Sequence, residues 1–164
     1  MRVPYFSLLA ILGVYLVVAP GFTDARAPAH RAAAAVAALP DPALTPGAVA
    51  TRDVVRICAP GYARAARHTS EALKVAIYAA YKMAPQTGHY VIDHLIPLEL
   101  GGADVAANLW PENEQTHGGN ARDKDRLENF LHREVCAGRI SLRQAQGEIA
   151  GNWRAAYRKY LGAR

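Results

Sequence analysis

The chain is poor in cysteine and has no long apolar run. Its two cysteines are far apart in the sequence, so the closely spaced pairs of a cysteine-rich zinc scaffold are absent. The longest uncharged apolar run, residues 6–19, covers 14 positions. A membrane-spanning helix needs ~20 apolar residues. The sequence therefore disfavours a zinc-finger protein and a spanning segment, and it shows no internal repeats.

The N-terminal apolar run has the features of an export signal. Arg2 precedes it, and the small residues Gly21, Ala25 and Ala27 follow it. This order is typical of a secretory signal peptide. We expect residues 1–27 to be removed and the protein to be secreted or periplasmic. An uncleaved anchor is the alternative, and the lack of a cysteine at the end of the run argues against a lipoprotein.

A linker is expected next. Residues 28–50 are mostly alanine, with Pro28, Pro40, Pro42 and Pro46 spaced through them. Such a composition favours a loosely extended tether over a packed element. The remaining residues, 51–164, are enough for one small domain.

Charge is distributed unevenly along the chain. Residues 1–92 hold nine Lys or Arg and four Asp or Glu, residues 93–135 hold four and nine, and residues 136–164 hold six and one. The net charges are 9 − 4 = +5, 4 − 9 = −5 and 6 − 1 = +5. An acidic centre between basic flanks suits a phosphodiester polymer. A solvated surface with uneven charge gives the same counts.

The two cysteines, Cys58 and Cys136, form an even pair in a chain expected to be exported. Such a pair most simply forms a disulfide. It would enclose the whole central region, and loop entropy makes a crosslink of that span worth roughly 4 kcal/mol. Two zinc ligands are the alternative.

Helical periodicity is clear in three places. Ser70 opens a helix with one apolar face, a second helical pattern starts at Ala121, and Ser141 with Gln144 forms a capping box at the start of a long last helix. The apolar positions of the three helices are Leu73, Ile77, Ala80 and Tyr81; Leu127, Phe130, Leu131 and Val135; and Leu142, Ala145, Ile149, Trp153, Ala156 and Tyr160.

Between the first two helices the pattern changes to that of strands. Alternating side chains predict a strand from Tyr90 to Pro97, and Gly101-Gly102 then turns the chain. Residues 108–110 predict a short return strand that ends at Pro111. The order is strand, loop, strand, helix, so we expect an α+β domain.

The central stretch resembles a known family. It carries DHLIPL at 93–98, GG at 101–102 and NL at 108–109, in that order and spacing. This set resembles the HNH (ββα-metal, His-Me finger) endonucleases, and the similarity to small exported bacterial HNH-like proteins runs from about Cys58 to Leu161. The resemblance implies a small ββα-metal motif embedded among helices, with a long C-terminal helix.

The resemblance also implies roles for individual residues. His94 is the expected base, since a neutral imidazole can take a proton from water near neutral pH. Asp93 is the expected metal ligand, because hard cations prefer carboxylate oxygen. Neighbouring side chains of a strand point to opposite faces, so both can serve one site only if the strand twists or breaks there. Asn108 is expected to orient the loop that carries the base.

A second metal ligand has two candidates. His117 stands nine residues after Asn108, the interval usual in the family, and Asn120 stands four residues before Lys124. Ala121 takes the place where some members carry a further histidine. A sparse site for one divalent ion follows, with Mg²⁺ the first choice and Mn²⁺, Ni²⁺ or Zn²⁺ as alternatives.

The expected function is that of an exported, metal-dependent HNH-type endonuclease acting on DNA or RNA. Arg122 and Lys124 are the expected phosphate contacts. No helix suited to reading bases and no aromatic stacking platform is evident, so sequence preference should be low. Nucleic acid is the expected partner, with no integral membrane partner evident and any inhibitor protein left open. The alternatives are a non-catalytic module that binds nucleic acid or an envelope polymer on the same fold, and a structural metal-binding domain.

Overall fold

The computed structural model describes Met1 and residues 39–85, 89–115 and 121–162, so the expected signal peptide lies outside the described residues apart from Met1. The domain mixes helices with one small antiparallel sheet and ends in a long helix, as the α+β expectation requires. Its elements, in chain order, are α2 (Val54–Ile57), α3 (Tyr62–Ala66), α4 (Glu71–Ala80), β1 (Tyr90–His94), η1 (Leu98–Leu100), η2 (Ala106–Asn108), β2 (Leu109–Asn113), α5 (Ala121–Cys136) and α6 (Leu142–Leu161).

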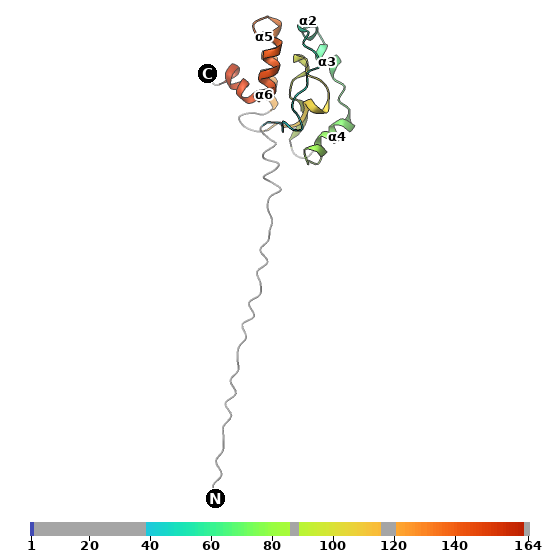
Figure 1. The fold of residues 1–164 in the computed structure, drawn as a ribbon, viewed down its shortest axis with the longest axis vertical. Helices are drawn as coiled ribbons and strands as arrows, with labels where there is room; N and C mark the ends of the chain where they lie inside the picture. The colour runs from blue at the N-terminus through green and yellow to red at the C-terminus, as the bar shows by residue number, and fades with distance from the viewer. Residues whose placement is uncertain (2–38, 86–88, 116–120, 163–164) are drawn as a thin grey trace.

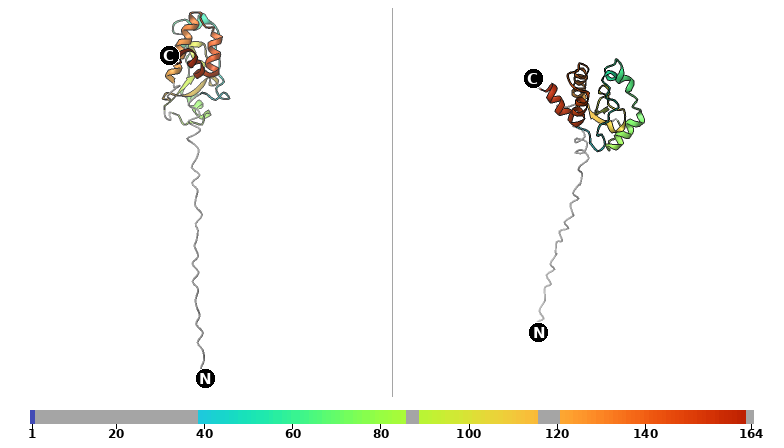
Figure 2. Two further views of the ribbon diagram at one scale, coloured as in Figure 1. Left: turned by 90° about the vertical axis from the view of Figure 1, so that its left-hand side faces the viewer. Right: turned by 45° about the horizontal axis from the view of Figure 1, so that its top comes forward.

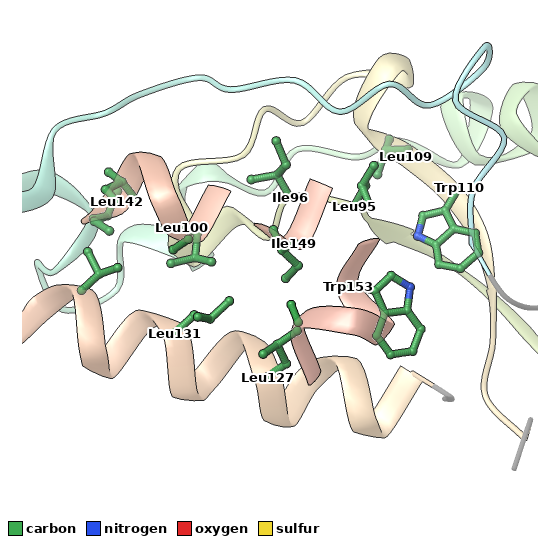
Figure 3. Packing of buried hydrophobic residues seen from close by; sticks show 14 of the residues in the cluster. Leu95, Ile96, Leu100, Leu109, Trp110, Leu127, Leu131, Leu142, Ile149 and Trp153 are labelled. Atoms are coloured by element: carbon green, nitrogen blue, oxygen red, sulfur yellow. The ribbon is translucent and has the colours of Figure 1, made fainter. Parts of the chain in front are cut away.

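The sheet lies between two groups of helices. The long helices α5 and α6 pack together on one side of it, α3 and α4 lie on the other side, and α2 contacts both α3 and α5 (Figures 1 and 2). The apolar faces predicted for α5 and α6 meet in the core, where Leu127 and Leu131 face Ile149 and Trp153 (Figure 3). No helix in the described part of the chain is long and apolar enough to cross a membrane.

The two strands pair over their whole length, with Tyr90 opposite Asn113 and His94 opposite Leu109. The expected stop at Pro111 is wrong, because β2 continues through it. Hydrogen bonds join residue 95 to 108 and residue 114 to 89, so the alternation of an antiparallel ladder places Pro111 at a position without ladder bonds. A proline there removes no bond from the sheet. The first strand also ends earlier than expected, at His94.

The predicted helix starts are confirmed. The Ser70 hydroxyl accepts a hydrogen bond from the Leu73 amide, and the Ser141 hydroxyl accepts one from the Gln144 amide at 3.2 Å. The Gln144 side chain donates to Glu148 rather than back to Ser141, so the capping box forms in one direction only.

The last helix bends at Asn152, which the sequence did not predict. The backbone there is extended, with φ −165° and ψ 91°. The Asn152 side-chain oxygen accepts the Ala155 amide at 2.9 Å, so this residue caps the second half of α6.

The segment before α2 packs against the domain, so the expected linker boundary at residue 50 is too late. Thr45 is buried, and its hydroxyl donates to the Leu109 carbonyl at 2.8 Å and pairs with the Tyr81 hydroxyl at 2.7 Å. Val49 forms a β-bridge with Gly102. Thr45 and Val49 therefore belong to the folded domain and cover the strand β2 and the Gly-Gly turn.

The predicted disulfide is confirmed. Cys58 and Cys136 are bonded, with their Cα atoms 5.8 Å apart, within the range that a disulfide requires. The bond joins the end of α2 to the end of α5.

The Gly101-Gly102 turn brings the following loop close to the segment after β1. Gly101 has φ +76°, which favours glycine. A Cβ atom on Gly102 would lie 1.9 Å from the Ile96 carbonyl oxygen, so the backbone at Gly102 approaches more closely than any side chain allows. This contact places the loop against the end of β1.

Replacing Gly102 with alanine should destabilise the domain. The added methyl group forces the loop away from Ile96, and overpacking of this kind costs about 1–3 kcal/mol. The matched control is Gly147→Ala, because Gly147 lies inside α6 with open space around it and alanine there should gain up to about 1 kcal/mol. Urea unfolding measures both. Equal unfolding free energies for the two variants would contradict the close approach.

Candidate functional site

The imidazole of His94 is held by a carboxylate from the next loop. His94 closes β1 and is 2% exposed, and its Nε2 lies 2.8 Å from Oδ1 of Asp104. Asp104 stands just beyond the Gly101-Gly102 turn, so the close approach of that turn brings the two side chains together. The side chain of Asp104 is 8% exposed, which makes this a largely buried pair.

Asp104 is itself fixed by donors from the segment before α4. The Thr69 hydroxyl and the His68 backbone amide both donate to its carboxylate. Burial raises the pKa of Asp104, but the hydrogen bonds from Thr69, His68 and His94 outweigh this effect and hold the pKa below its usual value. Asp104 is therefore ionised and acts as an acceptor. His94 must donate through Nε2, so Nδ1 is the unprotonated nitrogen of the neutral ring.

His94 is neutral at physiological pH. Burial lowers its pKa, and the hydrogen bond to Asp104 opposes that shift without reversing it. The exposed guanidinium of Arg67 lowers the pKa further by charge repulsion. A neutral imidazole with one nitrogen free can accept a proton, which is the property required of a general base.

Asn108 ties the loop to the chain that leaves β1, as the sequence analysis expects of it. Its side-chain oxygen accepts the Ile96 amide at 2.9 Å, and its side-chain nitrogen donates to the carbonyls of Ile96 and Ala103 at 2.8 and 2.9 Å. The same oxygen accepts the Ala48 amide at 3.3 Å. Asn108 is fully buried, so these bonds fix the backbone on both sides of the His94–Asp104 pair.

Asp93 serves a different environment. Its carboxylate accepts a hydrogen bond from Lys124 Nζ at 2.5 Å, whereas the neighbouring His94 side chain bonds to Asp104. Lys124 Nζ also donates to the His94 carbonyl oxygen at 2.6 Å and to Glu128. The strand does not bring the two side chains to one partner, and β1 keeps the alternation of a regular strand.

Lys124 lies at the centre of a buried cluster of carboxyl groups. Its side chain is 0% exposed, and although burial would lower its pKa, the charges of Asp93, Glu128 and Glu112 raise it. Burial also raises the pKa of Asp93, but Lys124 more than reverses this and brings the pKa down to about 2. Lys124 and Asp93 are therefore a charged pair at neutral pH.

Glu112 and Glu128, unlike Asp93, have pKa values above the usual range of a glutamate. Burial raises the pKa of Glu112 to about 9 and that of Glu128 to about 8. Both carboxyl oxygens of Glu112 are buried without a hydrogen-bond donor in the described part of the chain. Two ionised carboxylates can only accept hydrogen bonds and would repel each other. A protonated Glu112 can instead donate a hydrogen bond to the Asp93 carboxylate. With Glu112 protonated, the charge of Lys124 is shared between the carboxyl groups of Asp93 and Glu128, which both accept from its Nζ.

The expected metal ligands are only partly described. His117 and Asn120 lie outside the described residues. Asp93 is described, and it is not part of any cluster of three His, Cys, Asp or Glu ligand atoms in residues 39–85, 89–115 and 121–162. Its charge is already balanced by Lys124, so a divalent ion at Asp93 would compete with that ammonium group. The described residues alone do not make a fitting metal site.

The two expected phosphate contacts differ in exposure. Arg122 lies on the first turn of α5 and is exposed, which suits contact with a polymer. Lys124, further along the same helix, is wholly buried. A phosphate contact needs an accessible ammonium group, so the buried Lys124 is not available to bind a substrate.

The sequence analysis identifies neither Asp104 nor Glu112 as a site residue. Asp104 stands ten positions after His94 and just beyond the Gly-Gly turn. A carboxylate at that place could have indicated a partner for the histidine, because the turn folds the chain back toward β1. Glu112 stands in β2 opposite Val91, and the register that brings its carboxyl group near Asp93 and Lys124 cannot be read from local sequence.

Comparison of the chain with models of protein families, with curated proteins and with solved structures finds no match.

Replacing Glu112 with glutamine should change how stability depends on pH. In the wild type, Glu112 has a pKa of about 9 when folded and about 4.5 when unfolded, so the folded state binds the extra proton between these values. Its contribution to the unfolding free energy is complete below pH ~4.5 and falls by up to about 1.4 kcal/mol per pH unit as pH rises through that window. The glutamine side chain of the variant does not titrate, and its amide can still donate to Asp93.

The unfolding free energies of wild type and Glu112→Gln should therefore diverge between pH 5 and pH 9, with the variant gaining relative to the wild type. Urea titrations at several pH values, with a chelator present, measure this difference. Glu114→Gln is the matched control, because Glu114 is exposed and should leave the pH profile of the wild type unchanged. A difference that stays constant with pH for Glu112→Gln would show that Glu112 is not protonated in the folded state.

Proposed function

We propose that the chain is a metal-dependent, HNH-type endonuclease that hydrolyses phosphodiester bonds of DNA or RNA with little sequence preference. The observation that carries this proposal is the neutral imidazole of His94, held through Nε2 by the ionised Asp104. The strand–loop–strand–helix order around it, with Asn108 fixing the loop, is the arrangement that the HNH resemblance implies.

Residues of the chain can accept the proton that the attacking water loses in this reaction. Nδ1 of His94 takes a proton from the attacking water, and the imidazole becomes an imidazolium. Asp104 stabilises that positive charge across a 2.8 Å hydrogen bond and keeps the ring in one orientation. Thr69 and the His68 amide hold Asp104 in place, so the ring does not need to reorganise during the step.

Two exposed guanidinium groups are suited to hold the phosphate backbone. Arg67 lies close enough to His94 to lower the pKa of the imidazole, and Arg122 stands at the start of α5. A guanidinium group can donate two parallel hydrogen bonds to one phosphate group, and this contact does not depend on which base is attached. Low sequence preference and strong dependence of binding on salt follow from this kind of contact.

The metal requirement rests on the resemblance and on Asp93. When bound, a divalent cation would supply positive charge to the scissile phosphate. Of the three expected ligands, Asp93 is the one that the described residues include, and it is paired with Lys124. A cation at this position would therefore have to displace the ammonium group of Lys124 from Asp93.

A non-catalytic nucleic-acid-binding module is the second candidate. The observation that favours it is the Lys124–Asp93 pair, because an ammonium group already neutralises the carboxylate that a nuclease would use for its metal. Such a module would use the same exposed arginines and would bind without cleaving.

Replacing His94 with alanine should abolish most of the cleavage. Loss of a general base typically lowers turnover by ~10²–10⁴-fold. Relaxation of supercoiled plasmid and cleavage of a fluorescent RNA, each with Mg²⁺, Mn²⁺, Ni²⁺ or Zn²⁺, measure the rate. His89→Ala is the matched control, because His89 is exposed and precedes the same strand. It should cleave at the wild-type rate.

Asp104→Asn distinguishes a role in positioning from a role in folding. Asp104 raises the pKa of His94, so its neutralisation should move the acidic limb of the pH–rate profile to lower pH as well as slow the reaction. Cleavage by His94→Ala at the wild-type rate, or binding of nucleic acid by a wild type that cleaves nothing with any of the four metals, would replace the nuclease by the binding module.

A further inference from the structure

We propose that Cys58, His132 and Cys136 form a binding site for a thiophilic divalent cation, such as Zn²⁺, when their disulfide is reduced. The site is separate from the proposed nuclease site and does not depend on it. His132 lies eight residues beyond Lys124 on α5, which corresponds to about 12 Å along the helix.

The three side chains already converge on one point. One ligand atom from each, two sulfurs and a ring nitrogen, lie within 4.8 Å of one another. His132 and Cys136 are four positions apart on α5 and therefore share one face of the helix. Nε2 of His132 lies 3.4 Å from the sulfur of Cys136. Cys58 comes from the opposite side, as the residue that ends α2.

The spacing suits tetrahedral coordination. With Zn–S bonds of about 2.3 Å, two thiolates on one zinc ion lie about 3.8 Å apart. The two sulfurs are bonded in the oxidised chain and must move apart to reach this separation, whereas the ring nitrogen of His132 already lies within 4.8 Å of both. Two thiolates and one imidazole fill three positions, and Cys136 is exposed, so water can occupy the fourth and the ion can enter from solvent.

Reduction is required before the cation can bind. A dithiol reductant supplies two electrons and two protons, the Cys58–Cys136 bond breaks to give two thiols, and the reductant becomes a disulfide. The cation then binds both sulfurs as thiolates, and two protons pass to solvent. The oxidised chain lacks the thiolates, so it does not form this site.

A buried carboxyl group is available to support His132. Oε1 of Glu99 is buried without a hydrogen-bond partner in the described part of the chain. Burial raises the pKa of Glu99, and the charge of His132 is the largest opposing influence, which places the two groups near each other. Ligating histidines usually donate their other ring N–H to a carboxylate. Glu99 would accept from Nδ1 once the cation takes Nε2, which in the oxidised chain lies 3.2 Å from the Ile57 carbonyl oxygen and would have to leave it.

The site would give α2 and α5 the same crosslink in both redox states. In the oxidised chain a disulfide joins Cys58 to Cys136, and in the reduced chain the cation joins them through their sulfurs. The ion should therefore stabilise the reduced protein and leave the oxidised protein unaffected.

Titration of the reduced full chain with Co²⁺, under anaerobic conditions, tests the proposal. We expect one equivalent to bind with a sulfur-to-cobalt charge-transfer band and a visible spectrum of tetrahedral cobalt, and Zn²⁺ to displace it. His132→Ala should weaken binding by at least the ~10–100-fold that loss of even an outer partner costs. His89→Ala is the control and should bind as the wild type does. The Cys58→Ser, Cys136→Ser double variant should show no charge-transfer band.

Thermal unfolding of the same samples covers the case in which reduction loosens the fold. One equivalent of Zn²⁺ should raise the Tm of the reduced wild type, or restore its near-ultraviolet circular dichroism if that is lost, and should leave the oxidised protein unchanged. The proposal fails if cobalt binds without a charge-transfer band, if His132→Ala binds as tightly as the wild type, or if Zn²⁺ neither stabilises nor restores the reduced chain.

Discussion

The buried ammonium group of Lys124 joins the strand β1 to the helix α5. It donates to the Asp93 carboxylate, to the His94 carbonyl oxygen and to Glu128, so one side chain fixes both residues of the Asp-His pair relative to the helix. Removing one partner of a buried ion pair typically costs about 3–5 kcal/mol, because a charge is left uncompensated. The protonated Glu112 completes the cluster without adding charge. The position of the His94 backbone thus depends on this cluster.

The adjacent residues Asp93 and His94 of β1 contact different partners. Asp93 belongs to the cluster around Lys124, and His94 belongs to the pair with Asp104. The regular alternation of the strand enforces this division. A common cavity for both side chains, which the nuclease hypothesis requires, would need Lys124 to release Asp93 when a cation and substrate bind. The structure therefore supports the base more directly than the metal site.

Local patterns predicted the three longer helices, α4, α5 and α6, because capping by Ser70 and Ser141 and the apolar faces depend on residues a few positions apart. The short helices α2 and α3 were not predicted. The family resemblance, rather than periodicity, predicted that the Asn108 side chain ties its loop to the segment after β1. Local patterns failed where the answer depends on distant residues. The continuation of β2 through Pro111 follows from strand register, and the packing of Thr45 follows from a bond to a carbonyl 64 positions away. The Asp104–His94 pair depends on how a turn folds back, which periodicity does not encode.

Nitrogen-15 NMR of the His94 imidazole in the metal-free protein can determine whether Asp104 holds the ring neutral, with Nδ1 unprotonated. We expect a ring protonated at Nε2 and a pKa below the ordinary value of 6.5. The same spectra of Asp104→Asn should show a lower pKa still and a mixture of tautomers. A wild-type ring protonated at Nδ1, or a pKa above 6.5, would show that Asp104 does not prepare His94 as a base.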